Sequence, residues 1–169
     1  MYKTKQFMIS LCLLSGMAGS ALAAGSNSAA TAEAMRVIKA SGVVRMVKAT
    51  SQPAKFPCID KTWKKSEAEV QGLYVANFTS EELRAVADFY ETPLGVKYIT
   101  AFETQAYNRN HPAQVKAVAT FSDAEQNEIK QFYETPAGKK YMSGPEAQIM
   151  TDATMRIGFD IAVACFKAK

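Results

Sequence analysis

The chain has 169 residues, 48% of them hydrophobic and 21% charged, and its formal net charge is +4. This length suits a single domain with its own hydrophobic core. Lysine and arginine form no dense block anywhere in the chain, and this distribution argues against a nucleic-acid partner.

The N-terminus has the pattern of a secretory signal peptide. MYKTK supplies two positive charges, and FMISLCLLSGMAGSALA is an apolar stretch that ends in small residues, with an A-x-A cleavage pattern at residues 21–23. The apolar stretch is short for a membrane span, and no lipobox surrounds Cys12, so we expect a cleavable signal over residues 1–23. Cleavage near Ala23 would leave a flexible mature end at residues 24–30, and the mature protein would work in a bacterial periplasm or outside the cell.

Charge is unevenly distributed along the mature chain. Residues 24–65 hold eight Lys/Arg against Glu33 and Asp60, a surplus of +6, whereas residues 66–169 hold ten Lys/Arg against fourteen Asp/Glu, a net charge of −4. Two interpretations follow. The basic arm packs on the acidic body, or it contacts an anionic surface such as lipid headgroups or a cell-wall polymer.

The segment after the mature end reads as two short helices followed by a loop. We expect the first helix to break at residues 41–42, because a continuous helix would carry Arg45 and Lys48 onto its apolar face. The next segment, TSQPAKFPC, is expected to be a loop because Pro53 and Pro57 disfavour a helix.

The rest of the chain contains a tandem repeat. Residues 71–105 align with residues 114–148 at an offset of 43, with 15 identities in 35 positions. This density indicates that one supersecondary unit has been duplicated. Two copies are too few for an open solenoid, so we expect them to close on each other within a single domain over residues 31–169.

Each copy reads as a helix, a corner and a second helix. A capping box starts the first helix, at Thr79 in one copy and at Ser122 in the other. A Thr-Pro pair then ends this helix and begins the next, since a residue before proline leaves the α region and threonine suits an N-cap. A glycine in the next turn would let another backbone come close. The predicted corner residues are Phe89, Tyr90, Thr92, Pro93 and Gly95, and their counterparts Phe132, Tyr133, Thr135, Pro136 and Gly138.

The last segment, PEAQIMTDATMRIGFDIAVACFKAK, reads as one long helix with Asp152, Arg156 and Asp160 on a solvated stripe. These three charges argue against a membrane span, and Cys165 points away from them toward the core. Cys165 and Cys58 are the two cysteines left after signal cleavage. An even number in an oxidising compartment predicts a disulfide, with two buried free thiols as the alternative.

No strand-like alternation occurs in the mature chain. We therefore expect an all-α fold, a compact helical domain built on the duplicated helix-corner-helix unit plus the long C-terminal helix.

The signal peptide, the segment FTSEELRAVADFYETPLGVKY and the helical pattern resemble a bacterial family of exported proteins known as a domain of unknown function. The hallmark of that family, F-Y-x-[ST]-P-x-G-x-K, stands at residues 89–97 and again at residues 132–140. The resemblance covers roughly residues 31–160. It implies an all-α periplasmic fold, and it implies no catalytic residue and no ligand.

Residues that could carry chemistry are scarce. His111 is the only histidine, it lies in what reads as an exposed loop, and no nucleophile motif accompanies it. Two distant cysteines and scattered carboxylates do not make a metal site, so we expect no metal and no cofactor. The methionines of the mature chain are expected to fill the core.

Two classes of function remain open. The sequence favours a non-catalytic envelope protein that binds another envelope protein or a small apolar or peptidic ligand. The alternative is a cell-wall or lipid hydrolase that uses the paired carboxylates Glu91 and Glu134. The sequence leaves the oligomeric state open.

Overall fold

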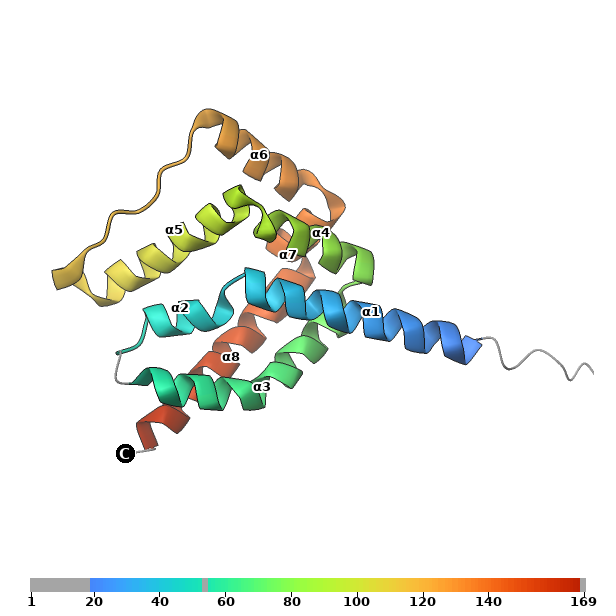
Figure 1. The fold of residues 1–169 in the computed structure, drawn as a ribbon, viewed down its shortest axis with the longest axis horizontal. Coiled ribbons are helices and arrows are strands. Elements are labelled where there is room, and N and C mark those ends of the chain that lie inside the picture. Colours follow the sequence, from blue (N-terminus) through green and yellow to red (C-terminus); the bar gives the residue numbers. More distant parts are fainter. Residues whose placement is uncertain (1–18, 53–54, 168–169) are drawn as a thin grey trace, which may run out of the picture.

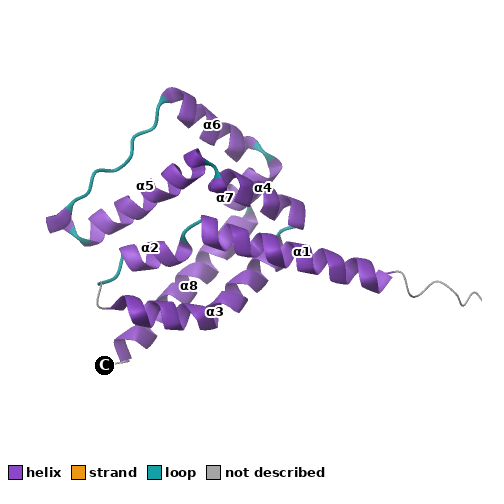
Figure 2. Cartoon of the chain, viewed as in Figure 1, coloured by secondary structure: helices purple, strands orange, loops and turns teal. Residues whose placement is uncertain are grey.

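The structure, a computed structural model, describes residues 19–52 and 55–167, so most of the expected signal peptide lies outside the described residues. Within the described residues the fold is all-α, as predicted, and contains no strand (Figure 1; Figure 2). The elements are α1 (Gly19–Ala40), α2 (Val43–Ala49), α3 (Phe56–Asn77), α4 (Ser80–Glu91), α5 (Pro93–Asn110), η2 (Pro112–Gln114), α6 (Asp123–Glu134), α7 (Pro136–Ser143) and α8 (Pro145–Lys167).

The arm formed by α1 and α2 bends at Gly42, where the sequence predicts a break. Gly42 has φ 68°, in the left-handed region, and a Cβ there would lie 2.4 Å from Oε1 of Glu103. Residues 24–30, which the sequence suggests as a flexible mature end, belong to α1 in the structure. This segment is rich in alanine, the strongest helix former, and Ala30 is already buried.

The predicted loop before Cys58 is also shorter than expected. Helix α3 begins at Phe56, so Pro57 and Cys58 belong to its first turn. Proline is tolerated at this position because the first amides of a helix have no intrahelical acceptor. Placing Cys58 on a helix fixes the direction of its side chain toward the C-terminal helix.

Both copies of the repeat fold into a helix, a corner and a second helix, namely α4–α5 and α6–α7. In the first corner the hydroxyl oxygen of Thr92 accepts from the Gly95 amide at 2.9 Å, and the hydroxyl donates to the Phe89 carbonyl at 2.7 Å. Thr135 makes the same two bonds in the second corner, at 3.0 and 2.7 Å. Each threonine therefore closes one helix and opens the next.

The two copies pack against each other with reciprocal contacts. Nζ of Lys97 lies 2.6 Å from Oε1 of Glu125, and its counterpart Lys140 lies 2.8 Å from Oε2 of Glu82. Each lysine also sits over an aromatic ring of the other copy, at 5.1 and 5.2 Å from the ring centroid. Such an exchange, in which residue i meets j and the counterpart of i meets the counterpart of j, is the signature of two-fold symmetry.

The corner aromatics lie on the approximate two-fold axis. Phe89 stacks on its own counterpart Phe132, with centroids 3.9 Å apart and planes only 2° from parallel. Two edge-to-face tyrosine contacts, at 6.0 and 5.8 Å, repeat the exchange on either side, Tyr98 with Tyr133 and Tyr141 with Tyr90. The repeated decapeptide is thus the interface between the two copies as well as the corner within each.

The arm breaks this symmetry because α1 packs along α4 and has no equivalent on α6 (Figure 1). Leu83 and Ala87 of α4 are completely buried at this contact. Their counterparts in α6, Gln126 and Lys130, are exposed. The second copy therefore lacks, at these two positions, the apolar face that the first copy turns to the arm.

Ion pairs hold the basic arm to the acidic body. The Arg36 guanidinium lies 2.8 Å from Asp88 and 2.5 Å from Glu91, and Arg45 lies 2.7 Å from Glu103. These carboxylates raise the pKa of Arg36 through their hydrogen bonds, that of Glu91 first. Of the two interpretations of the charge split, packing of the arm on the body is present in the structure, and contact with an anionic surface stays a prediction.

The C-terminal helix is fastened to α3 by the predicted disulfide. Cys58 and Cys165 are 107 residues apart in sequence, and their Cα atoms lie 5.5 Å apart. Cys165 is buried, as the helical pattern predicts. On the solvated stripe Arg156 pairs with Asp160 at 3.7 Å and also with Glu69 of α3. Helix α3, which precedes the two corners in the sequence, and helix α8, which follows them, are thereby joined.

Candidate functional site

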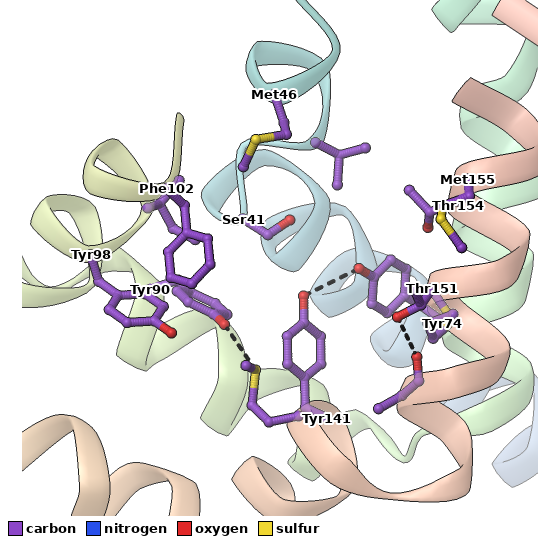
Figure 3. Close-up of a pocket in the computed structure, with 15 residues that line it drawn as sticks. Ser41, Met46, Tyr74, Tyr90, Tyr98, Phe102, Tyr141, Thr151, Thr154 and Met155 are labelled. Atoms are coloured by element: carbon purple, nitrogen blue, oxygen red, sulfur yellow. Dashed lines mark hydrogen bonds between the residues drawn. The ribbon is translucent and has the colours of Figure 1, made fainter. Parts of the chain in front are cut away.

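An open groove lies where the arm, the first copy of the repeat and α8 meet. Its volume is about 560 Å³. Figure 3 shows Met46 of α2, Phe102 of α5 and Met155 of α8 on different sides of the groove. Val43 of α2 and Ile99 of α5 also line it. These segments are far apart in sequence, and the bend at Gly42 and the Thr-Pro corners bring them together.

The walls of this groove are apolar and carry no charge. The fifteen residues around it include none of Asp, Glu, Lys, Arg or His. Among them are five aromatic residues and four methionines, Tyr74, Tyr90, Tyr98, Phe102, Tyr141, Met46, Met142, Met150 and Met155. Such a lining favours an apolar guest over a charged one, because a charge there would lose its hydration without gaining an ion partner.

The apolar surface extends beyond the mouth of the groove. Phe102, Met142 and Met155 are 44%, 39% and 62% exposed, and Phe159 and Phe166 of α8 are 69% and 72% exposed. Met155, Phe159 and Phe166 follow at spacings of four and seven residues, which places them on one face of α8. This face of α8 therefore presents exposed apolar side chains, of which Met155 lines the groove.

Hydroxyl groups lie inside the groove. The hydroxyls of Tyr74 and Tyr141 are 3.3 Å apart, with Ser41 beside them, and the Tyr90 hydroxyl donates to the sulfur of Met142 at 3.6 Å (Figure 3). Burial raises the pKa of Tyr74, of Tyr90 and of Tyr141 above the usual value for tyrosine. These hydroxyls therefore stay protonated and neutral at physiological pH.

The structure corrects the expectation that the methionines only fill the core. Met150 is buried and Met35 packs against the core, as expected. Met46, Met142 and Met155 instead line the groove at half-buried or exposed positions. Methionine side chains are flexible and polarisable, and on a concave surface they can adapt to apolar guests of different shape.

The predicted corner residues are divided between structure and groove. Tyr90 lines the groove, while Phe89 and Phe132 stack on the two-fold axis and Thr92 and Thr135 cap helices. Sequence analysis did not identify Ser41, Tyr74 or Met155 as groove residues. Only the apolar spacing along α8 offered a signal for Met155.

The two carboxylates of the hydrolase hypothesis lie outside the groove. Glu91 is held by Arg36 at the contact between α1 and α4, and Oε1 of Glu134 lies 3.9 Å from Nζ of Lys130 on the surface of α6. Neither carboxylate lines the groove. No shared cleft therefore supports a joint role in acid–base chemistry.

The single histidine has a local structural role. His111 caps the C-terminal end of α5, its ring stacks on Tyr107 at 4.1 Å, and its Nδ1 lies 3.0 Å from the Tyr107 carbonyl oxygen. In the part of the chain that the structure describes, no group of three or more His, Cys, Asp or Glu residues could hold a metal ion. No helix among residues 19–52 and 55–167 is long and apolar enough to cross a membrane.

Comparison with known families finds one family model twice along the chain. The family model described as an uncharacterized protein conserved in bacteria (DUF2059) matches residues 65–104 and again residues 118–157. The chain is thus similar to the DUF2059 family, and each match contains one of the two Thr-Pro corners. No curated protein and no solved structure gives a significant match. The first match spans the end of α3, α4 and most of α5, and the second spans α6, α7 and the first half of α8.

Proposed function

We propose that this protein is a non-catalytic binding protein of the bacterial cell envelope, and that the groove between α2, α5 and α8 holds an apolar ligand. The observation that carries the proposal is a groove of about 560 Å³ whose walls hold no charged side chain. Pockets of this size with apolar and aromatic walls and a few polar groups are typical ligand sites. Four methionines and an exposed apolar mouth add a surface that suits a guest of variable shape.

The proposed location rests on two features of the chain. Residues 1–23 have the pattern of a cleavable export signal, and Cys58 and Cys165 form a disulfide. Disulfides persist in oxidising compartments such as the periplasm and the extracellular medium. Fractionation of the producing bacterium should place the protein outside the cytoplasm with its N-terminus near Ala24. Recovery of full-length chain from the cytoplasm would contradict the proposed export.

Binding can be tested with Nile red, a neutral dye whose fluorescence rises in apolar surroundings. The mature protein should increase Nile red emission in a saturable way. Met155→Asp should abolish this increase, because it places a charge on the rim of the groove. Ile149→Asp is the matched control, since Ile149 is also an exposed apolar residue of α8, at 48%, and does not line the groove.

Circular dichroism should show that both variants keep their helices. Equal loss of dye binding in the two variants would mean that the dye reports general surface hydrophobicity and would contradict the groove as the site. Retention of dye binding by Met155→Asp would do the same. A protein partner in place of a small ligand would show as capture of one envelope protein by the wild type and no saturable dye binding.

A further inference from the structure

The inner part of the groove differs chemically from its mouth. Ser41 and Tyr141 are half-buried and Tyr74 is buried, whereas Phe102 and Met155 at the mouth are exposed. Three hydroxyls therefore lie farther in than the two exposed apolar side chains. Buried Ile99 and Met150 add apolar surface beside them, and the exposed Thr151 hydroxyl donates to the Ala147 carbonyl of its own helix. A guest with a hydrogen-bonding end and an apolar remainder would match this gradient from inside to outside.

The inner hydroxyls are not saturated by their bonds to each other. The Tyr74 and Tyr141 oxygens are 3.3 Å apart, and Ser41 Oγ lies 3.4 Å from the Ile38 carbonyl oxygen. Hydroxyl hydrogen bonds are usually closer to 2.7–2.8 Å. Each hydroxyl can donate once and accept twice. Ser41 also interacts with both tyrosine hydroxyls, and the three groups together still leave acceptor positions for a third oxygen or nitrogen.

The group that fits this place is neutral. A carboxylate or an ammonium would lose most of its hydration beside the hydroxyls, and no side chain around the groove carries a compensating charge. The tyrosines are themselves neutral, because burial raises the pKa of each hydroxyl. A hydroxyl, ester or amide can exchange hydrogen bonds with them at no cost in charge burial.

On the basis of the proposed function, we infer that the guest is a neutral single-chain amphiphile that binds with its head inward. Its uncharged head meets the hydroxyls of Ser41, Tyr74 and Tyr141. Its hydrocarbon chain runs outward past Phe102 and Met155, where the exposed stripe of α8 continues the apolar surface. The hydroxyls of Tyr74 and Tyr141 determine which head group binds, and Phe102 and Met155 contact the hydrocarbon chain.

The test is displacement of Nile red by amphiphiles of equal chain length and different head. Dodecanol should displace the dye from the mature protein at a concentration about tenfold lower than dodecanoate or dodecylamine at neutral pH, as expected when a buried site rejects an uncompensated charge. Within an alkanol series, affinity should rise roughly fourfold for each added methylene until the chain passes the mouth of the groove.

Two variants test head recognition. Tyr141→Phe keeps the ring and removes its hydroxyl, so the preference for dodecanol over dodecane should shrink by about fivefold. Tyr107→Phe is the matched control, because the Tyr107 hydroxyl bonds to Gln114 and does not line the groove. Its preference should equal that of the wild type.

The outcomes distinguish this inference from the proposed function. Saturable dye binding with equal displacement by dodecanol, dodecanoate and dodecylamine would overturn the neutral head and leave the binding function in place. An unchanged preference in Tyr141→Phe would overturn the inward orientation of the head. Absence of saturable dye binding in the wild type would overturn the proposed function itself.

Discussion

The glycine of each corner offers a sharp test of the fold, because its replacement by alanine should have the opposite sign from the same change elsewhere in a helix. A Cβ at Gly95 would lie 2.1 Å from the Phe89 carbonyl oxygen, and a Cβ at Gly138 would lie 2.0 Å from that of Phe132. At Gly158, in the middle of α8, a Cβ would meet nothing within 4 Å. All three residues are helical, so helix propensity alone would favour alanine at each.

The expected magnitudes follow from these distances. Ordinary carbon–oxygen contacts are about 3.3 Å or longer, so the end of the preceding helix would have to move by about 1 Å. Overpacking of this kind costs about 1–3 kcal/mol, and weakening the Thr135 cap, which Gly138 donates to, adds about 1 kcal/mol. Subtracting a propensity gain of about 1 kcal/mol leaves Gly138→Ala less stable by about 1–3 kcal/mol. Gly158→Ala should be more stable by about 0.5–1 kcal/mol.

Urea unfolding followed by circular dichroism measures both changes. The midpoint should fall for Gly138→Ala and for Gly95→Ala, and it should rise for Gly158→Ala. The opposite signs matter more than the sizes, because a general effect of alanine cannot produce them. A midpoint raised in Gly138→Ala as in Gly158→Ala would refute the close approach of the two helices at the corner.

Three further predictions concern the cap, the disulfide and the exchanged ion pairs. Thr135→Ala should lower the free energy of unfolding by about 1 kcal/mol in urea melts, while Thr120→Ala in the exposed loop before α6 should change it little. The Cys58–Cys165 disulfide closes a loop of 107 residues, so its reduction should lower the melting temperature. The loss in free energy of unfolding should be at most about 4.7 kcal/mol. An unchanged melting curve in reductant would argue against the disulfide. The hydrogen bond from Lys97 lowers the pKa of Glu125 in the folded protein, so its stabilisation is full above the unfolded pKa of about 4.3 and is lost as the pH falls through the lower folded value. In Lys97→Met the free energy of unfolding should fall less steeply as the pH is lowered through this range. In Lys130→Met, which removes a looser pair at 3.9 Å, it should fall as in the wild type.

The parts of the fold that the sequence predicts are those governed by local chemistry. The corners at Thr92 and Thr135 follow from Thr-Pro pairs, and the bend at Gly42 follows from the phase of apolar and basic residues. The helix over residues 24–30 and the early start of α3 at Phe56 were missed for a related reason. In residues 24–30 the helix-forming tendency of alanine outweighs the opposite tendency of the serines and the glycine. Proline breaks the interior of a helix but is tolerated in its first turn, where Pro57 lies.

The groove could not be predicted in the same way, because its parts are assembled by tertiary packing. Tyr74 and Tyr141, whose hydroxyls meet, are 67 residues apart in sequence. The exchange between the copies did leave a trace, since both members of the Lys97–Glu125 pair recur at the offset of 43 in Lys140 and Glu82. Recurrence of both partners is what a two-fold contact requires, but sequence alone cannot say whether they meet within a copy or between copies.

The groove lies where the two-fold symmetry of the copies is broken. Tyr98 and Tyr141 are equivalent by the repeat, and both reach across to a tyrosine of the other copy. Only Tyr141 also meets Tyr74, because α3 precedes the first copy as a helix whereas residues 115–122 precede the second as a loop. The symmetric centre of the two copies therefore forms one side of the groove, and the arm, α3 and α8 supply its other walls. A single copy of the domain would contain the corner and half of the aromatic interface, but it would lack the walls from which this groove is built.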